Sequence, residues 1–291
     1  MILVFGKTGQ VARALARQAS DALCLPRAAA DLTRPAQCAA LIAHYRPAAV
    51  INAAAFTAVD RAEAEEETAM HVNAHAPGAM AAACADMGIP FVHLSTDYVF
   101  PGTGDTPWRP DDTTAPLNAY GRSKLAGEAA VRAAGGVHAI LRTSWVFSAD
   151  GANFVTSMLR LAQTHDCLQI VADQIGGPTP AAAIADCCLT IAARLQTAPD
   201  CSGTYHFAGA ADVSWADFAR TIFAEAGLAV SVSDIPASAY PTAAIRPANS
   251  RLDCTTTETV FGVARPDWRA ALRTLLPDLL DAHPAERRIA T

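Results

Sequence analysis

A tyrosine and a lysine lie four residues apart, as Tyr120 and Lys124, in the segment PLNAYGRSKLAGE. Four residues make about one helical turn, so the two side chains lie on one face of the helix that this segment predicts. A lysine ammonium beside a phenol favours the phenolate and lowers the pKa of the tyrosine from about 10. Such a tyrosine is a general acid/base near neutral pH. An exposed surface pair has the same spacing, so this interpretation depends on the elements that precede the helix.

The first of these elements is an apolar run, Ile2–Phe5, followed by Gly6, Gly9 and Ala12 in a G-x-x-G-x-x-A pattern. Between a strand and a helix this pattern is typical of a dinucleotide loop. Gly6 permits the tight turn, and Gly9 lets the backbone approach a pyrophosphate at the helix N-terminus. A plain tight turn is the alternative. The spacing of a Walker P-loop is missing, which excludes that kind of phosphate site.

The choice between NAD and NADP depends on the end of the second strand, Leu25-Pro26-Arg27, which carries no acid. An acid there binds the ribose 2′-hydroxyl of NAD, whereas a nearby arginine accepts the 2′-phosphate of NADP. Arg27 either does this or forms an exposed salt bridge. Asp31 either contacts the adenine or caps the next helix. We expect NADPH as the cofactor, with NADH accepted.

Two further strands end in residues suited to a ligand site. Ala53, Ala54 and Ala55 follow the third strand and leave room either for a flat cofactor or for close helix–sheet packing. The fourth strand ends in Ser95-Thr96-Asp97, and ligands of open parallel sheets bind outside the carboxyl ends of the strands. Thr96 is therefore expected to hydrogen-bond a substrate carbonyl. Asp97 either orients the substrate or caps a turn.

Apolar runs and helical patterns alternate along the first half of the chain. This alternation predicts a parallel sheet covered on both faces, a Rossmann-type doubly wound α/β fold. We expect a dinucleotide-binding domain over 1–150 and a smaller α/β substrate-binding domain over 151–291, with some segments returning to the sheet. The expected strands are Ile2–Phe5, Ala22–Leu25, Ala49–Asn52, Phe91–Ser95, Ala139–Thr143, Leu168–Val171 and Tyr205–Phe207. The expected helices are Gln10–Ser20, Pro35–Tyr45, Glu63–Met87, the helix of Tyr120, Phe154–Thr164, Ala181–Gln196, Trp215–Ala226 and Trp268–Leu280.

Composition argues against several classes of protein. The chain has 291 residues and is 52% hydrophobic, yet it has no apolar run long enough to span a membrane. Its first residues lack the features of a signal peptide, so we expect a cytoplasmic protein. The net charge is −6 and the basic residues are dispersed, which argues against a nucleic-acid partner.

The sequence predicts no metal site. None of the eight cysteines forms a CxxC pair, so free thiols in a reducing compartment are expected. His71 and His75 share one helical face, but a third ligand and the HExxH context are missing. Surface or interface histidines are the favoured interpretation.

Taken together, these segments resemble the extended short-chain dehydrogenase/reductase family, and within it the dTDP-4-dehydrorhamnose reductases. The resemblance runs nearly from end to end, and STDYVFPG and the DQxGxPT stretch are specific to this subgroup. The matching segments are FGKTGQVA, VINAAAFTAVDRAE, STDYVFPGTGDTPW, APLNAYGRSKLAGE, LRTSWVFS, DQIGGPT and RPANSRLD.

The resemblance implies a role for particular residues. Thr96, Tyr120 and Lys124 would form a catalytic triad, with Tyr120 as proton donor, Lys124 holding the nicotinamide ribose and Thr96 binding the C4 carbonyl. The implied cofactor contacts are Gly9, Gln10 and Val11 at the pyrophosphate, Asp31 and Leu32 at the adenosine, and Ala53, Ala54 and Ala55 along the cofactor. The implied substrate contacts are Trp145, Asn153 and Arg251. The alternative for Trp145 is an aromatic residue of the core, and Arg251 is implied because arginine suits phosphates.

The implied activity is NADPH-dependent reduction of the C4 keto group of dTDP-4-dehydro-β-L-rhamnose, the step that gives dTDP-β-L-rhamnose for cell-surface polysaccharides. Two alternatives stay open: a reductase or epimerase of another nucleotide-sugar, and a non-catalytic NADP-binding regulatory subunit. Ala12 and Ala14 depart from the family pattern. Some members carry at the position of Ala14 a glutamate that helps magnesium bridge two subunits. We therefore expect no bound metal, and the homodimer that we expect is not bridged by magnesium.

Overall fold

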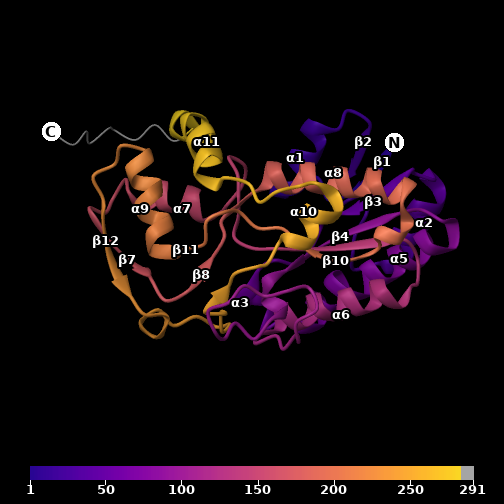
Figure 1. The fold of residues 1–291 in the computed structure, drawn as a ribbon, viewed down its shortest axis with the longest axis horizontal. Helices are drawn as coiled ribbons and strands as arrows, with labels where there is room; N and C mark the ends of the chain where they lie inside the picture. The colour runs from indigo at the N-terminus through magenta and orange to yellow at the C-terminus, as the bar shows by residue number, and fades with distance from the viewer. Residues whose placement is uncertain (283–291) are drawn as a thin grey trace.

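A six-stranded parallel sheet forms the centre of the computed structural model, which describes residues 1–282 (Figure 1). The strand order is β10-β5-β4-β3-β1-β2. The order reverses between β1 and β3, and in such sheets the crevice at this point binds the ligand. The expected doubly wound fold is therefore confirmed. The strands are β1 (Ile2–Phe5), β2 (Ala22–Leu25), β3 (Ala49–Asn52), β4 (Phe91–Thr96), β5 (His138–Thr143) and β10 (Gly203–His206).

Helices cover both faces of this sheet, because successive side chains of each strand point to opposite faces. Val4 faces a core formed with α1 and α8, whereas Leu3 faces a core formed with α2, α5 and α6. Figure 1 shows α1 and α8 above the sheet and α5 and α6 below it. These helices are α1 (Gln10–Gln18), α8 (Ala181–Thr197), α2 (Pro35–Tyr45), α5 (Ala76–Met87) and α6 (Ala119–Ala133).

The long helix expected over Glu63–Met87 is present from Glu66 to Met87 and contains one turn of π-helix. The segment consists of α4 (Glu66–Met70), a π-helical turn η1 (His71–His75) and α5, and a short helix α3 (Val59–Ala62) precedes it. Pro77 cannot donate a backbone hydrogen bond to the carbonyl four residues earlier, that of Asn73. The side-chain amide of Asn73 hydrogen-bonds with the backbone N–H and C=O of Phe56. Helix α6 packs against the backbone carbonyl of Asn73. Gly127 makes this contact possible, since a Cβ there would lie 2.0 Å from the Asn73 oxygen.

The second half of the chain builds its own core around Trp268, which is fully buried. The helices α7 (Phe154–Leu161), α9 (Trp215–Glu225) and α11 (Trp268–Ala282) enclose it together with β7 (Cys167–Val171). The parallel partner of β7 is β12 (Ser231–Ile235), which the sequence did not predict. Residues 283–291, the end of the second expected domain, lie outside the described part of the chain. The other elements are β6 (Val146–Phe147), β8 (Ile175–Gly176), β9 (Thr179–Pro180), β11 (Val213–Ser214), β13 (Asn249–Ser250), α10 (Thr255–Phe261), η2 (Asp97–Val99), η3 (Pro199–Cys201) and η4 (Ala237–Ala239).

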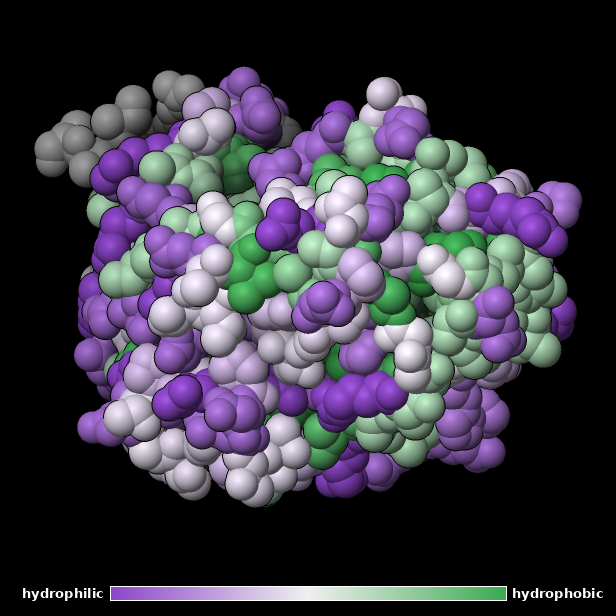
Figure 2. Space-filling model, turned by 45° about the vertical axis from the view of Figure 1, so that its right-hand side comes forward, coloured by the Kyte–Doolittle hydropathy of each residue, from purple (hydrophilic) through white to green (hydrophobic). Residues whose placement is uncertain are grey.

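The surface is mixed in polarity. Figure 2 shows hydrophobic residues in separate groups on one face, with hydrophilic side chains between them. Within residues 1–282, no helix is both long enough and apolar enough to span a bilayer. The most exposed large hydrophobic side chains are Tyr240 and Ile245, which lie in the segment between β12 and β13.

Candidate active site

The loops after β1 and β3 meet at the point where the strand order reverses. Phe5 and Asn52 pair across the two strand ends, and the Ala53 N–H donates to the Phe5 carbonyl at 3.0 Å. Gly6 has a φ of +116°, and a Cβ there would lie 3.3 Å from the Ala53 backbone. Any other residue at position 6 would therefore be strained and crowded. The predicted tight turn is present at the point where the strand order reverses.

The N-terminus of α1 fits a dinucleotide pyrophosphate. Gly9 is its N-cap residue, no side chain caps the helix, and the first turn carries no acid. The first backbone N–H groups of a helix lack partners within it and face an anion favourably. A Cβ on Gly9 would meet no atom within 4 Å, so this side of the loop is open. Gln10 and Val11 supply N–H groups of the same turn.

We expect the variant Gly9→Asp to keep the fold and lose the cofactor. Gly9 has φ −69° and ψ 157°, a conformation in which aspartate is a favoured N-cap residue, so the free energy of unfolding should not fall. The carboxylate would repel a pyrophosphate, and we expect the Kd for NADPH to rise by about tenfold or more. Urea unfolding and a fluorescence titration with NADPH measure the two effects. Gly9→Ala is the uncharged control, and an equal loss of affinity in both variants would contradict the electrostatic argument.

At the other end of the crevice, the structure joins the two residues expected near the adenosine. Arg27, whose side chain is 83% exposed, lies 3.8 Å from Asp31 in an ion pair. The Asp31 carboxylate also accepts the Thr33 N–H at 3.0 Å, which makes it the cap of a turn. Leu32 is buried in the core under α2 and α5. Both interpretations of Arg27 therefore stay open in this structure, since the weak ion pair leaves its guanidinium accessible.

Thr96 and Tyr120 lie together at the carboxyl end of β4. Asn118 caps α6 by accepting the Gly121 N–H at 2.8 Å, which places Tyr120 in the first turn. Thr96 is close enough to the Tyr120 phenol to lower its pKa, and the Thr96 hydroxyl donates to Asp97 at 3.0 Å. The structure thus brings together three of the residues that the sequence predicted for the substrate carbonyl.

The predicted effect of Lys124 on Tyr120 is wrong for this structure. Burial raises the pKa of Tyr120 to about 12, the nearby Thr96 hydroxyl lowers it, and the Asp97 charge raises it. The Lys124 side chain does not act on the phenol because its nitrogen donates to the Leu94 carbonyl at 2.6 Å. Tyr120 is therefore a protonated phenol at neutral pH. This state suits a group that donates a proton to a reduced carbonyl oxygen.

Asp97 is not the cap of the turn after β4, because the Thr96 hydroxyl accepts the Tyr98 N–H there. Asp97 opens the 3-10 turn η2 directly after β4 and is 3% exposed. Burial raises the pKa of its carboxyl group to about 6, against the hydrogen bond from Thr96 that lowers it, and its Oδ2 has no hydrogen-bond partner among residues 1–282. Thr143 ends β5 beside Thr96, and its buried hydroxyl has no partner among residues 1–282. The sequence analysis missed Thr143, although it ends a buried strand as Thr96 does.

Trp145 lies near this strand edge in an unusual conformation. Its φ is +48°, which a bulky residue adopts only when the surroundings enforce it. Its ring stacks on Trp215 with 3.5 Å between ring centroids, and Phe154 tilts against Trp215 at 4.6 Å. Gly176 makes room for the indole, since a Cβ there would lie 2.8 Å from the Trp145 ring. Trp145 is partly exposed, so it has both a packed ring face and accessible atoms.

Asn153 has a structural role that the sequence analysis did not predict. Its Oδ1 accepts the Thr156 N–H as the N-cap of α7, and its Nδ2 donates to the Ser148 carbonyl. The same Nδ2 donates to the Gln10 side chain at 3.2 Å. Asn153 thus connects the dinucleotide loop with the second half of the chain. Its role as a substrate contact stays a prediction.

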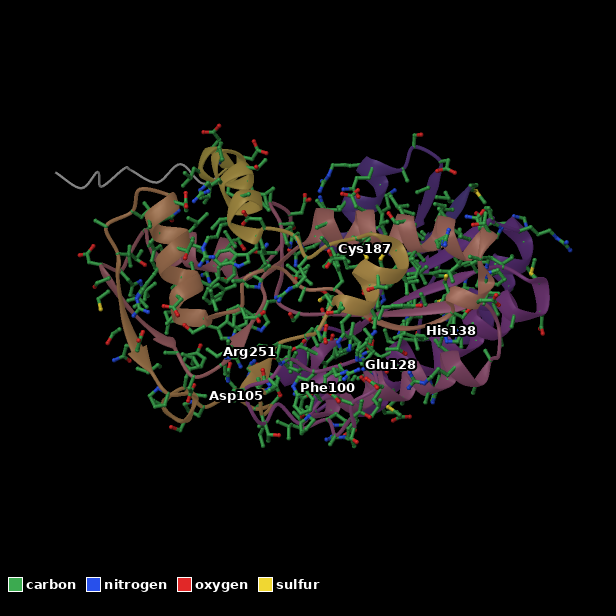
Figure 3. The ribbon with its side chains drawn as sticks, in the orientation of Figure 1. Phe100, Asp105, Glu128, His138, Cys187 and Arg251 are labelled. Carbon is green, nitrogen blue, oxygen red and sulfur yellow. The ribbon has the colours of Figure 1, made fainter. Side chains whose placement is uncertain are left out.

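Arg251 is held beside the loop between β4 and α6. Its Nη1 donates to Asn249 Oδ1 at 3.0 Å, and its carbonyl accepts the Trp108 N–H at 2.9 Å. Asn249 also donates to the Thr106 carbonyl, so the RPANSRLD and STDYVFPGTGDTPW segments are joined. None of the ion pairs found within residues 1–282 includes Arg251. Figure 3 shows it near Asp105 of this loop.

His71 and His75 form a pair away from the strand ends. Their Nδ1 atoms are 3.2 Å apart on the exposed side of η1. Within the described residues, no group of three or more histidine, cysteine or acidic side chains is placed to hold a metal ion. All eight cysteines are free thiols.

This architecture, with a nucleotide loop at the switch point and a tyrosine–lysine helix beside it, defines a Rossmann-type dinucleotide-binding protein. Residues 1–280 match the family described as RmlD substrate binding domain. A dTDP-4-dehydrorhamnose reductase of Sinorhizobium fredii is 45% identical over 96% of this chain and 97% of its own length. One of Burkholderia thailandensis is 46% identical over 96% of this chain and 99% of its own. The chain belongs to the dTDP-4-dehydrorhamnose reductase family.

Solved structures agree with this assignment. A reductase of this name from Clostridium acetobutylicum superimposes with a TM-score of 0.88 at 34% identity, covering 96% of this chain and 99% of the other. One from Bacillus anthracis, in complex with NADP, has a TM-score of 0.88 at 31% identity and covers 95% and 98%. The resemblance stated from the sequence motifs is therefore confirmed.

Proposed function

We propose that this protein reduces the C4 keto group of dTDP-4-dehydro-β-L-rhamnose to give dTDP-β-L-rhamnose, with NADPH as reductant. The observation that carries the proposal is the approach of Thr96 to the Tyr120 phenol at the carboxyl end of β4, in a sheet where the N-terminus of α1 is open. A protonated phenol and a hydroxyl at the strand ends are the groups that a carbonyl reduction requires. The NADP complex of the Bacillus anthracis relative supports the cofactor.

The reaction follows from these positions. NADPH, when bound, supplies the hydride that reduces C4. The Thr96 hydroxyl donates to Asp97 in the free protein and would turn to donate to the carbonyl oxygen when the sugar binds, which would hold the sugar in line with the phenol. Tyr120 transfers its proton to the oxygen as negative charge develops there, so no free alkoxide accumulates. Lys124 would hold the nicotinamide ribose, and Gly6, Ala53, Ala54 and Ala55 would line the path of the cofactor.

The preference for NADPH is assigned to Arg27. A 2′-phosphate would draw the guanidinium from its long ion pair with Asp31, since phosphate accepts two hydrogen bonds from arginine. We expect Arg27→Ala to raise the KM for NADPH by about tenfold while the KM for NADH stays nearly unchanged. Steady-state assays with both cofactors measure this. Arg34→Ala is a nearby basic control, and equal effects on NADPH and NADH would contradict the assignment.

The substrate half of the site is assigned to Asp97, Trp145, Asn153 and Arg251. Trp145 would pack against the sugar, and Arg251 would bind a phosphate of the nucleotide. A panel of dTDP- and UDP-linked 4-keto sugars tests both the nucleotide and the sugar. Turnover only with the dTDP-linked substrate supports the proposal. Turnover only with UDP sugars supports the reductase or epimerase alternative, and NADPH binding without turnover supports a regulatory subunit.

Three expectations from the sequence stay predictions. They are the division into domains at residue 150, the cytoplasmic location and the homodimer. Light scattering of the purified chain measures the oligomeric state directly.

A further inference from the structure

A buried chain of side chains connects the cofactor loop with Lys124. The side-chain nitrogen of Asn52, at the end of β3, lies 3.1 Å from His93 Nδ1. His93 Nε2 in turn lies 3.3 Å from Lys124 Nζ. All three residues are at most 2% exposed, so solvent water does not compete for these hydrogen bonds. The site description above gives His93 no role, and the sequence analysis did not single it out.

The direction of the hydrogen bonds in this chain is fixed from one end. The Ala54 N–H donates to Asn52 Oδ1 at 3.2 Å, and a backbone N–H is always a donor. The other atom of the Asn52 amide is therefore its NH₂ group, which donates to His93 Nδ1. A histidine that accepts at Nδ1 carries its proton on Nε2 when neutral. His93 is neutral because burial and the nearby Lys124 lower its pKa well below the ordinary value.

It follows that His93 directs an N–H group at Lys124. An ammonium has only donors, whereas a neutral amine has a lone pair that accepts. The amine form of Lys124 can accept from His93 Nε2 and still donate to the Leu94 carbonyl at 2.6 Å. The ammonium form would face His93 donor to donor. We propose that His93, oriented by Asn52, is a positioning residue that favours the neutral amine of Lys124 in the cofactor-free protein.

The charges around Lys124 are consistent with this arrangement. Burial lowers the pKa of Lys124 to about 8, and Glu128 on the same helix opposes that change. Glu128 is largely neutralised by Arg142 of β5, which leaves little charge to favour the ammonium. On β4, the titratable group in contact with Lys124 is His93. Other charged groups near α6 act elsewhere: Asp97 on Tyr120, Glu63 on the Ala119 N–H, Glu66 on Arg122 and Asp60 on Arg246.

The inference matters for catalysis only if the proposed function holds. Above its midpoint near 8, Lys124 would then have to gain a proton to hold the nicotinamide ribose as an ammonium, so cofactor binding and proton uptake would be coupled at alkaline pH. The alkaline limb of kcat/KM for NADPH reports such a group in the free enzyme. In His93→Gln, whose side-chain oxygen accepts from an ammonium, we expect this limb to move to higher pH.

The tautomer of His93 is tested first in the unaltered protein. In ¹⁵N-histidine-labelled protein without cofactor, we expect His93 to show an unprotonated Nδ1 and a protonated Nε2 at neutral pH. The signal is assigned by its loss in His93→Gln. A protonated Nδ1 would overturn the inference, and this measurement does not depend on whether any variant folds.

The titration of Lys124 is tested second, and the chain makes this simple because Lys7 and Lys124 are its two lysines. With ¹³Cε-labelled lysine, Lys7→Arg identifies the Lys124 signal, whose midpoint we expect near 8. In His93→Gln we expect the midpoint to rise by about one pH unit. His138→Gln, on the neighbouring strand, is the control and should leave it in place (Figure 3). An unchanged midpoint in folded His93→Gln would overturn the inference.

Asn52→Asp gives an independent test with an isosteric change. The carboxylate would accept from Nδ1–H, so we expect the His93 tautomer to switch and the Lys124 midpoint to rise. Retention of the Nε2–H tautomer would contradict the role of Asn52. None of these readouts uses a sugar substrate, so a shifted Lys124 midpoint with no turnover would reject the proposed function alone. Turnover with an unshifted midpoint would reject this inference alone.

Discussion

Tyr120→Phe is expected to lose about 10²–10⁴-fold in kcat with dTDP-4-dehydro-β-L-rhamnose. The phenylalanine ring fills the same space, so packing is kept and the hydroxyl alone is lost. In the proposed reaction the Tyr120 phenol would be the proton donor, and its raised pKa keeps the proton in place at neutral pH. The affinity for NADPH should stay unchanged because the α1 N-terminus is untouched. Single-turnover kinetics and an NADPH titration measure the two quantities.

A second phenol close by provides the control for this variant. The Tyr98 ring lies 5.7 Å from the Tyr120 ring, edge to face, and its removal as Tyr98→Phe should leave most of the turnover. Equal losses in the two variants would show that packing of this ring pair, and not proton donation by Tyr120, limits the reaction.

Arg142→Leu should destabilise the protein by about 3–5 kcal/mol. Arg142 and Glu128 form a bidentate ion pair, in which Nε donates to Oε1 at 2.8 Å and Nη2 donates to Oε2 at 2.7 Å. Their side chains are 3% and 0% exposed. Removal of the arginine leaves a carboxylate buried with only the Ser95 hydroxyl, at 2.7 Å, and a more distant Arg132. Figure 3 labels Glu128 at α6, and its side chain is fully buried. Urea unfolding followed by circular dichroism measures the loss.

Two matched variants separate the buried charge from the loss of an arginine. Arg132→Leu removes a guanidinium that also contacts Glu128, at 3.3 Å, but is 41% exposed, so the expected loss is at most about 1 kcal/mol. The double variant Glu128→Leu with Arg142→Leu removes both charges and should recover part of the stability. Similar losses for Arg132→Leu and Arg142→Leu would contradict the argument.

Much of the nucleotide-binding half could be predicted from the sequence because each signal there is local. A strand that ends in Gly6, a helix that begins near Gln10 and a helix that carries Tyr120 are all determined by neighbouring residues. The five strands expected in this half appear with bounds that differ by at most one residue. The carboxyl ends of parallel strands meet at one edge, so Thr96 could be placed in the site without coordinates.

The parts that could not be predicted depend on contacts between distant segments. The π-helical turn before α5 lies where the Asn73 side chain bonds Phe56 and the Asn73 carbonyl packs against Gly127. The Lys124 nitrogen points to β4 rather than to the phenol because a carbonyl and a histidine of that strand lie within reach. The effects of burial on the pKa values of Tyr120 and Lys124 cannot be predicted from the spacing of residues in the sequence. β12 was missed because its sequence, SVSDI, is polar and mostly exposed.

The most direct test of the central claim follows the hydride. The protein is incubated with dTDP-4-dehydro-β-L-rhamnose and NADPH that carries deuterium at both positions of the nicotinamide C4, and the product is examined by NMR and mass spectrometry. We expect dTDP-β-L-rhamnose with one deuterium, at C4 of the sugar, and one oxidised cofactor for each product formed. Recovery of the unlabelled keto sugar with the cofactor intact would contradict the account.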